Sequence, residues 1–506
     1  MRVAVVGAGP KGLFATERLA AHLVAAGTAA DITLSDAQPP GWGAGYRPDQ
    51  PDFLRLNVDS GIVTIDGAQP GRPSLGLTDF TTWRLAHDEV EPLDPFPPRS
   101  LVGRYFACCW RELLHRVPPS VHLRHAARRV ERLTSSDGGW LVDSAPFDEV
   151  LLCTGHATDW PGALRHQWHG PQILVPQVYP VTDRLSVDAV PAGCTVACRG
   201  AALTFIDALL TLTEGRGGRF DENGYHRSGN EPARILPVAR RGAFLQVKPA
   251  RNGPLAALNV AAARACGLAR CAAANGDVSV VLGAVQQTAA SYLATASGRE
   301  VTLPATEQDP VEALSTSLEV ALGTQPPGQQ WALGQAWRDL YPAIVDALGH
   351  QHSSADEWQR FADFAAAMEP LAFGPPTVNA AKLLALCRAG VVDAGYLNGR
   401  WGEALQTADV VIDCVLPPPG LIEGQSPGSL VDDGLLTQAT GRRGVAVAPD
   451  ACCLASDGTR IRGLSALGRP TEDVVIGNDT LSRSLHSAAD LWAERVARLH
   501  TEEPDE

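Results

Sequence analysis

The sequence lacks several features, each of which is typical of a large class of proteins. Its 506 residues include eleven cysteines but no CxxC pair, whereas secreted disulfide scaffolds are short and rich in cysteine. No run of about 20 apolar residues occurs, so we expect no membrane-spanning segment. The thirteen histidines show no metal-ligand spacing such as HExxH, and there is no GxSxG nucleophile elbow. We therefore expect a cytoplasmic protein with reduced thiols and no bound metal.

The net charge argues against two kinds of binding partner. The net charge of −14 argues against a protein that coats nucleic acid or an anionic membrane. Apolar residues make up 45% of the chain, which is enough for a large core.

At about 150 residues per domain, the length predicts two to four domains. The chain passes from Met1 directly into an apolar strand, so we expect no signal peptide. The oligomeric state stays open, a homo-oligomer included.

The first 36 residues have the pattern that opens a doubly wound α/β fold. Residues 2–6 form a short valine-rich strand, and the glycine-rich turn 7–12 follows it. The pattern predicts a helix over 12–26 and a second strand over 31–35, which ends at Asp36.

The glycines of this turn have the GxGxxG spacing of a dinucleotide site. Gly7 permits the tight turn, Gly9 lets the backbone approach a pyrophosphate, and Gly12 lets the helix pack close to the strand. The helix N-terminus then presents free N–H groups to the phosphates. A carboxylate at Asp36 can accept hydrogen bonds from a ribose diol. The alternative is a glycine-rich turn without a ligand, which this context disfavours.

Two later segments allow both a cofactor role and a purely structural one. The buried-looking strand 147–155 ends in Thr154 and Gly155, and small residues there let the chain pass near a dinucleotide. Many buried strands end in glycine, however. Before the final predicted helix, 480–500, Asp479 or Thr480 suits the N-cap. That helix N-terminus either faces a flavin ring or is an ordinary capped helix.

A second α/β unit is expected from about residue 193. Its turn contains Gly200 and Thr204 but lacks the GxGxxG spacing, and its next strand ends in Arg240 and Arg241. Arginines at that position either read the 2′-phosphate of NADPH or form a solvated basic turn.

The two arginines of a neighbouring glycine-rich loop also have two interpretations. Arg216 and Arg219 either clamp a phosphate or carboxylate or lie in a solvated loop. Residues 305–395 look mostly helical. The expected division is an FAD-binding part over 1–165, an NAD(P)H-binding-like domain over 166–304, a helical region over 305–400 and a return to the first domain over 401–506.

Together these motifs resemble a known family. The segments 5–13, 41–58, 96–105, 151–156, 212–220 and 463–483 are similar to class B-like flavoprotein monooxygenases, nearest to the bacterial branch related to amino-acid N-hydroxylases such as aspartate N-monooxygenases. The resemblance covers the N-terminal third and the C-terminal end. It implies two Rossmann-like dinucleotide-binding domains, for FAD and NADPH, with an additional mostly helical region.

The resemblance also implies a set of site residues. The expected FAD-binding residues are Gly7, Gly9, Pro10, Gly12, Asp36, Tyr46, Asn57, Arg104, Val130, Thr154, Gly155, Gly468, Asn478, Asp479 and Leu481, and the expected NADPH-binding residues are Gly200, Thr204, Arg240 and Arg241. Asn57 and Arg469 are the catalytic candidates, and Arg216, Arg219 and Arg469 are candidates for binding a substrate carboxylate.

The implied activity is a monooxygenase reaction in which NADPH reduces FAD and O2 then forms an adduct at flavin C4a. The leading hypothesis is N-hydroxylation of an amino acid or small amine. Baeyer–Villiger oxidation or C-hydroxylation is the first alternative. His156, Trp160 and Pro161 match the HxxxWP half of the Baeyer–Villiger fingerprint FxGxxxHxxxWP, whereas Leu152 stands at the position of its glycine. A non-oxygenating FAD-dependent oxidoreductase and a non-enzymatic FAD-binding protein are the others.

Overall fold

A parallel β-sheet with a glycine turn at its edge organises the N-terminal half of the molecule. The structure is a computed structural model, and it describes residues 1–67, 71–87, 93–297, 309–351, 354–423 and 426–499. The first sheet has the strand order β14-β15-β7-β1-β2-β3, and only β14 is antiparallel to its neighbour. Its strands are β1 (Arg2–Val6), β2 (Ala30–Ser35), β3 (Val121–Ala126), β7 (Glu149–Leu152), β14 (Cys452–Leu454) and β15 (Arg460–Ala466).

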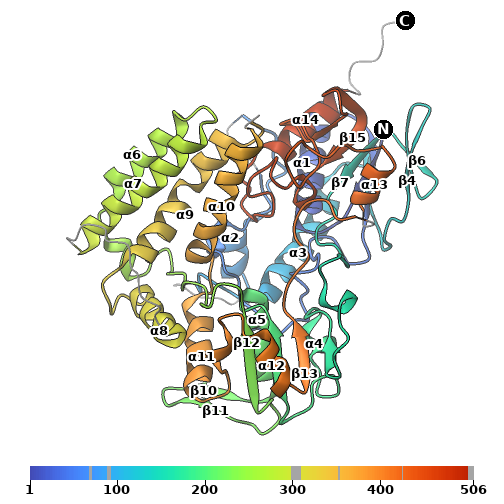
Figure 1. Cartoon of the computed structure of the whole chain (residues 1–506). Coiled ribbons are helices and arrows are strands. Elements are labelled where there is room, and N and C mark those ends of the chain that lie inside the picture. Colours follow the sequence, from blue (N-terminus) through green and yellow to red (C-terminus); the bar gives the residue numbers. More distant parts are fainter. Residues whose placement is uncertain (68–70, 88–92, 298–308, 352–353, 424–425, 500–506) are drawn as a thin grey trace, which may run out of the picture.

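Two helices from opposite ends of the chain cover this sheet side by side. Helix α1 (Pro10–Ala26) packs against α14 (Ala488–Arg498), as Figure 1 shows at the top of the molecule. Pro10 occupies the first turn of α1, where a missing N–H costs nothing, and Gly27 ends the helix at a left-handed φ of 67°. The fully buried Leu19 and Trp492 belong to the shared core beneath them. The C-terminal segment therefore completes the N-terminal domain.

A second parallel sheet, with the order β12-β9-β13-β8, forms the lower part of the molecule (Figure 1). Helix α5 (Leu203–Leu212) follows its strand β9 and supplies the buried Phe205 and Leu209 to its core. The strands of this sheet are β8 (Ile173–Val175), β9 (Thr195–Arg199), β12 (Arg234–Val238) and β13 (Val410–Asp413).

A layer of helices lies between β12 and the return of the chain to the second sheet. Its core contains Trp337, Leu340 and Ile344, and it also takes in Ile476 from the C-terminal segment. The layer therefore packs on the first domain. Its helices are α6 (Ala261–Ala272), α7 (Val278–Ser297), α9 (Gln329–Leu348) and α10 (Ala355–Ala372). Helix α8 (Pro310–Ala321) lies between α7 and α9 in the sequence, but Leu314 and Leu318 pack in the core of the second sheet.

The remaining elements are short or peripheral. Strands β4, β5 and β6 form a small antiparallel sheet, and β10 and β11 form a hairpin. They span β4 (Leu133–Ser136), β5 (Gly139–Val142), β6 (Ala145–Phe147), β10 (Arg219–Asp221) and β11 (Gly224–His226), and the other helices are α2 (Phe80–Leu85), α3 (Arg99–Arg116), α4 (Val181–Arg184), α11 (Thr377–Arg388), α12 (Trp401–Thr407) and α13 (Gly428–Asp432).

The predicted fold class is confirmed: two parallel-sheet α/β units are present with an additional helical region. The packing differs from the expected division of the chain at two points. The helical layer begins at Ala261, and β13 pairs with β9 in the second sheet although it falls in the stretch 401–506. The expected boundary at 304 lies outside the described residues. None of the helices in the described ranges combines the length and apolar character that crossing a membrane requires.

Candidate dinucleotide and substrate site

The carboxyl ends of neighbouring strands bring the predicted glycine motifs to one edge of the first sheet. Cys153 N donates to Val6 O at 2.7 Å, and Leu467 N donates to Leu152 O at 2.9 Å. Gly7 N donates to Ser35 O at 2.9 Å. The segments that follow β1, β7, β15 and β2 therefore leave the sheet side by side, which is where open α/β sheets bind ligands.

The glycine turn after β1 tolerates no side chain at its first and third glycines. Gly7 has a φ of +100°, and a Cβ there would lie 2.2 Å from Cys153 O. A Cβ at Gly12 would lie 2.0 Å from Gly7 O. At Gly9 the nearest atom would be Gly43 Cα at 3.5 Å, so the turn is open at its centre. Gly9 also has no side chain to cap α1, and this leaves the first N–H groups of the helix free for a pyrophosphate.

Asp36 lies beside this turn at the end of β2. Its Oδ2 accepts a hydrogen bond from Ala8 N, and its Oδ1 accepts one from Gln38 N, both at 2.9 Å. Each carboxylate oxygen has a second lone pair, so the half-buried side chain can still accept from a ribose diol. The turn and the carboxylate together fit the phosphate–ribose part of a dinucleotide.

The C-terminal segment closes the same edge. Gly468 follows β15 with a φ of +78°, and a Cβ there would lie 3.3 Å from Lys11 Cγ. Arg469 forms a 3.9 Å ion pair with the exposed Asp479. Asn478 is 3% exposed and donates to Glu472 Oε2 at 2.6 Å. These predicted residues therefore lie together beside the glycine turn.

The predicted start of the last helix is wrong. Helix α14 begins at Ala488 after Ser487, so neither Asp479 nor Thr480 caps it. The Thr480 hydroxyl instead accepts from Ser482 N at 3.0 Å within a turn. The segment has to leave the helical layer, where Ile476 is buried, before a helix can pack on α1. Residue 500, the predicted end of this helix, lies outside the described residues.

Lys11 is a site residue that the sequence motifs did not reveal. It lies inside the glycine turn, and the chain has only two other lysines, Lys248 and Lys382. Burial lowers the pKa of the Lys11 ammonium to about 8, although the charge of Asp479 opposes this shift. The signal was available in the motif itself, because Lys11 stands between its second and third glycines, in the turn that would hold the phosphates.

Replacing Lys11 by methionine is expected to weaken FAD binding about tenfold or more at neutral pH, since hydrogen bonds to charged groups contribute about 1.5–3 kcal/mol. The amine is charged below its pKa of about 8, so the advantage of the wild type should shrink as the pH rises through that value. Titration of the apoprotein with FAD, followed by flavin fluorescence, measures both effects. The control is Lys382→Met, because Lys382 pairs with Glu214 at 2.6 Å in the second unit. Equal FAD affinities for both variants would contradict the prediction.

The residues expected on the flavin side of the site differ in their burial and in what they contact. Tyr46 is half-buried, with its ring edge-on to Phe106 at 6.0 Å, and burial raises the pKa of its phenol to about 12. Asn57 donates from Nδ2 to Phe373 O at 3.4 Å, which joins the first domain to the helical layer. Leu481 is buried in the core of the first domain.

Two other residues of this set lie toward the periphery of the first domain. Arg104 is exposed on α3. Val130 is half-buried against the apolar cluster that contains Val6 and Trp140. Thr154 is half-buried and Gly155 exposed directly after β7.

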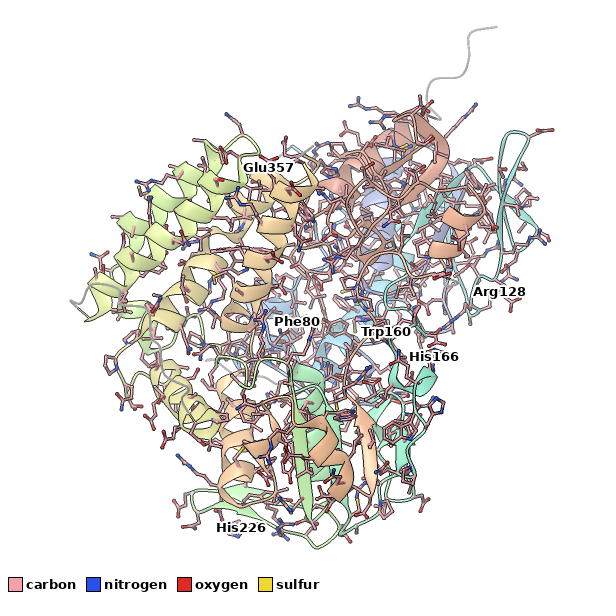
Figure 2. All side chains as sticks on the ribbon, viewed as in Figure 1. Phe80, Arg128, Trp160, His166, His226 and Glu357 are labelled. Carbon is pink, nitrogen blue, oxygen red and sulfur yellow. The ribbon has the colours of Figure 1, made fainter. Side chains whose placement is uncertain are left out.

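The turn of the second unit is held by a buried ion pair. Gly200 has a φ of +103° after β9. The preceding Arg199 makes a two-pronged contact with Asp413, at 2.8 and 2.7 Å, and lies 5.8 Å from the centre of the Trp160 ring. Figure 2 shows Trp160 where the chain passes between the two α/β units. Trp160, one residue of the half fingerprint, therefore packs on Arg199 of the second unit.

The other residues predicted around this turn have different surroundings. Thr204 is buried on α5, and Arg240 is exposed two residues after β12. Arg241 donates to Ala366 O on α10.

Arg216 and Arg219 lie apart from the glycine turn. The Arg216 guanidinium donates to the backbone oxygens of Leu185, Ser186 and Asn230, at 3.0–3.1 Å. Arg219 is exposed in the hairpin opposite His226, which Figure 2 labels at the far end of the second unit. The hydrogen bonds of Arg216 are those of a structural residue. The described part of the chain contains no group of three or more His, Cys, Asp or Glu placed to hold a metal ion.

Comparison with known proteins gives the N-terminal domain a family. A family model described as FAD-NAD(P)-binding matches residues 4–157. The nitrosuccinic acid synthase of Aspergillus oryzae is 32% identical over 269 residues, which are 49% of this chain and 41% of that protein. An L-aspartate N-monooxygenase (nitrosuccinate-forming) of Streptomyces davaonensis is 30% identical over 294 residues, 49% of this chain and 44% of that protein.

The aligned region thus spans less than half the length of these curated relatives. Among solved structures, the FAD-bound cadaverine monooxygenase of the desferrioxamine pathway from Erwinia amylovora is 12% identical, with a TM-score of 0.47 over 98% of this chain and 93% of that one. The matched range 4–157 contains the glycine turn, Asp36 and the end of β7. Residues 4–157 of this chain are therefore an FAD/NAD(P)-binding domain.

Proposed function

We propose that the protein is an FAD-dependent, NADPH-using monooxygenase that N-hydroxylates an amino acid or small amine. The observation that carries the proposal is the edge of the first sheet, where an open glycine turn, Asp36 and the C-terminal segment meet inside an FAD/NAD(P)-binding domain. The second parallel sheet offers a separate place for NADPH. The names of the partial relatives, which specify L-aspartate and nitrosuccinate, support an acidic amino acid as the first substrate to test.

FAD, when bound, would supply electron transfer from NADPH and the activation of O2. The chain's own task is to bind, orient and exclude water. The N–H groups at the start of α1 would hold the pyrophosphate, and Asp36 would hold the ribose. Ile476 is buried in the core of the helical layer, so the C-terminal turn packs against α9 and α10. That contact brings the apolar helical layer beside the C-terminal turn, and a desolvated pocket there would favour an uncharged substrate amine.

Replacing Arg240 by alanine is expected to raise the KM for NADPH about tenfold and to leave the KM for NADH nearly unchanged. Arg240 is exposed just beyond β12, where an arginine reads the 2′-phosphate that only NADPH carries. Steady-state flavin reduction with each nucleotide measures the effect, and Arg219→Ala is the control because Arg219 lies in the β10–β11 hairpin. A parallel change for both nucleotides would remove Arg240 from NADPH recognition.

The decisive experiment mixes the NADPH-reduced holoprotein rapidly with oxygenated buffer, with and without L-aspartate, and follows the flavin spectrum. A long-lived absorbance change before reoxidation, together with an N-hydroxylated product, is the expected result. Direct reoxidation with stoichiometric peroxide under both conditions would indicate a non-oxygenating flavoprotein instead. Oxygen insertion only into ketones would favour the Baeyer–Villiger alternative.

A further inference from the structure

Two half-buried cations from different segments lie where the helical layer meets the first domain. Lys248 follows β12 in a stretch that runs beside residues 374–376, and its N donates to Pro375 O at 2.8 Å. Its ammonium lies 5.6 Å from the centre of the Phe373 ring. Arg338 projects from α9 and donates to Ala372 O at 2.8 Å. Both cations therefore border the short segment 372–376 at the end of α10.

Neither cation has a counter-ion among the described residues. In the part of the chain that the structure describes, no carboxylate lies within ion-pair distance of Lys248 or Arg338, and Arg338 also donates to the neutral Gln335 Oε1 at 2.6 Å. Asp339, the residue after Arg338 on α9, accepts from Tyr292 and Gln335 instead, at 2.8 and 3.0 Å.

Desolvation destabilises the charged forms of Lys248 and Arg338, and a bound anion would offset this effect. Burial, and then the charge of Arg338, lower the pKa of Lys248 to about 7, while Asp59 opposes the shift. Burial also lowers the pKa of Arg338 to about 10, against the charge of Asp339. A desolvated cation without an ion-pair partner is unfavourable, whereas two cations close together attract a carboxylate.

The same region is continuous with the flavin side of the proposed site. Phe373, beneath Lys248, accepts the hydrogen bond of Asn57 and lies 5.7 Å from the ring of Tyr341. A Cβ at Gly477, next to Asn478, would lie 2.9 Å from Tyr341 Cε1. The Phe373 and Tyr341 rings therefore bridge the two cations and the C-terminal turn.

Carboxylates act on the Tyr341 hydroxyl as well. Burial, and then the charges of Asp479 and Glu369, raise the pKa of Tyr341. The region thus presents groups of both signs, which suits a zwitterionic ligand.

We propose that Lys248 and Arg338 bind a carboxylate of the substrate, which makes the substrate an amino acid or another small carboxylic acid. This inference rests on the proposed function for the identity of the reaction, but the anion site can be tested without it. It replaces Arg216 and Arg219 as substrate-binding residues, because the Arg216 guanidinium is occupied by backbone oxygens and Arg219 lies in the distant hairpin.

The test measures binding of L-aspartate and of succinate to the FAD-loaded protein by calorimetry, in the wild type, Lys248→Gln, Lys248→Arg and Arg338→Gln. Each neutral variant should weaken both ligands about tenfold to a hundredfold, since one charged contact is lost. FAD content and NADPH-driven flavin reduction without substrate should stay unchanged. Lys382→Gln, in the second unit, is the matched control.

A second readout separates binding from a purely structural role. Wild-type affinity for succinate should fall as the pH rises above about 7, because Lys248 loses its charge there, while the Arg338 guanidinium keeps its charge up to a pKa of about 10. Lys248→Arg should retain affinity at high pH, and Lys248→Gln should show a flat profile. Equal affinities in wild type and Lys248→Gln, or no binding of either ligand to the wild type, would overturn the proposal.

The two proposals fail in different ways. Loss of succinate binding in the variants, without any N-hydroxylation by the wild type, would support the anion site and count against the reaction. N-hydroxylation of L-aspartate with an unchanged KM in Lys248→Gln and Arg338→Gln would leave the reaction standing and remove these residues from substrate binding.

Discussion

Replacing Gly12 by alanine is expected to abolish stable FAD retention. The added Cβ would lie 2.0 Å from Gly7 O and 3.3 Å from Val5 Cγ1, so the backbone of the turn itself would have to move. Overpacking of this kind costs about 1–3 kcal/mol, and here the displaced atoms belong to the turn that approaches the pyrophosphate. We therefore expect FAD affinity to fall about tenfold to a hundredfold. The visible flavin absorbance of the purified protein, relative to protein concentration, measures the retained cofactor.

The control for this substitution is Gly45→Ala. No atom lies within 4 Å of a Cβ built at Gly45, and its φ is not positive, so FAD content should match the wild type. Circular dichroism and thermal unfolding of the apoproteins show whether Gly12→Ala still folds. If the two variants retained FAD equally, the close packing of α1 on the turn would not matter for binding.

Replacing Arg99 by alanine is expected to destabilise the protein by about 3 kcal/mol or more. Arg99, at the start of α3, pairs with Asp207 on α5, and the Tyr179 hydroxyl donates to the same carboxylate. The Asp207 side chain is only 8% exposed, so removing the arginine leaves a buried charge without its main partner. Denaturant unfolding followed by fluorescence measures the loss.

Two further variants test whether the loss of stability comes from the unpaired buried charge of Asp207. Arg47→Ala breaks a pair with Asp49, whose side chain is 63% exposed, and should cost at most about 1 kcal/mol. The double variant Arg99→Met with Asp207→Leu should recover part of the stability, because no unpaired charge remains. A loss for Arg99→Ala no larger than for Arg47→Ala would show that this pair does not bind the first domain to the second.

Local pattern accounts for the parts of the site that lie next to one another in the sequence. The strand, the GxGxxG turn, the helix and Asp36 follow within 36 residues, and each is recognisable from glycine spacing and hydrophobic period. The same rules predicted a second α/β unit from about residue 193, close to the start of β9 at Thr195, but they did not predict β8. They misplaced the start of the last helix because Asp479 and Thr480 are good caps locally, while burial of Ile476 holds that segment in a turn.

The sequence by itself determined the class of the fold and the dinucleotide turn, because hydrophobic period and glycine spacing are set within a few residues. The exclusion of a side chain at Gly7 already depends on the tertiary structure, since the atom that a Cβ would meet is Cys153 O. Only the tertiary structure decided which distant groups share a site. Asn57, Lys248 and Arg338 come from three separate segments and meet around the end of α10. No local spacing encodes that meeting, since it depends on how the helical layer packs against the first domain.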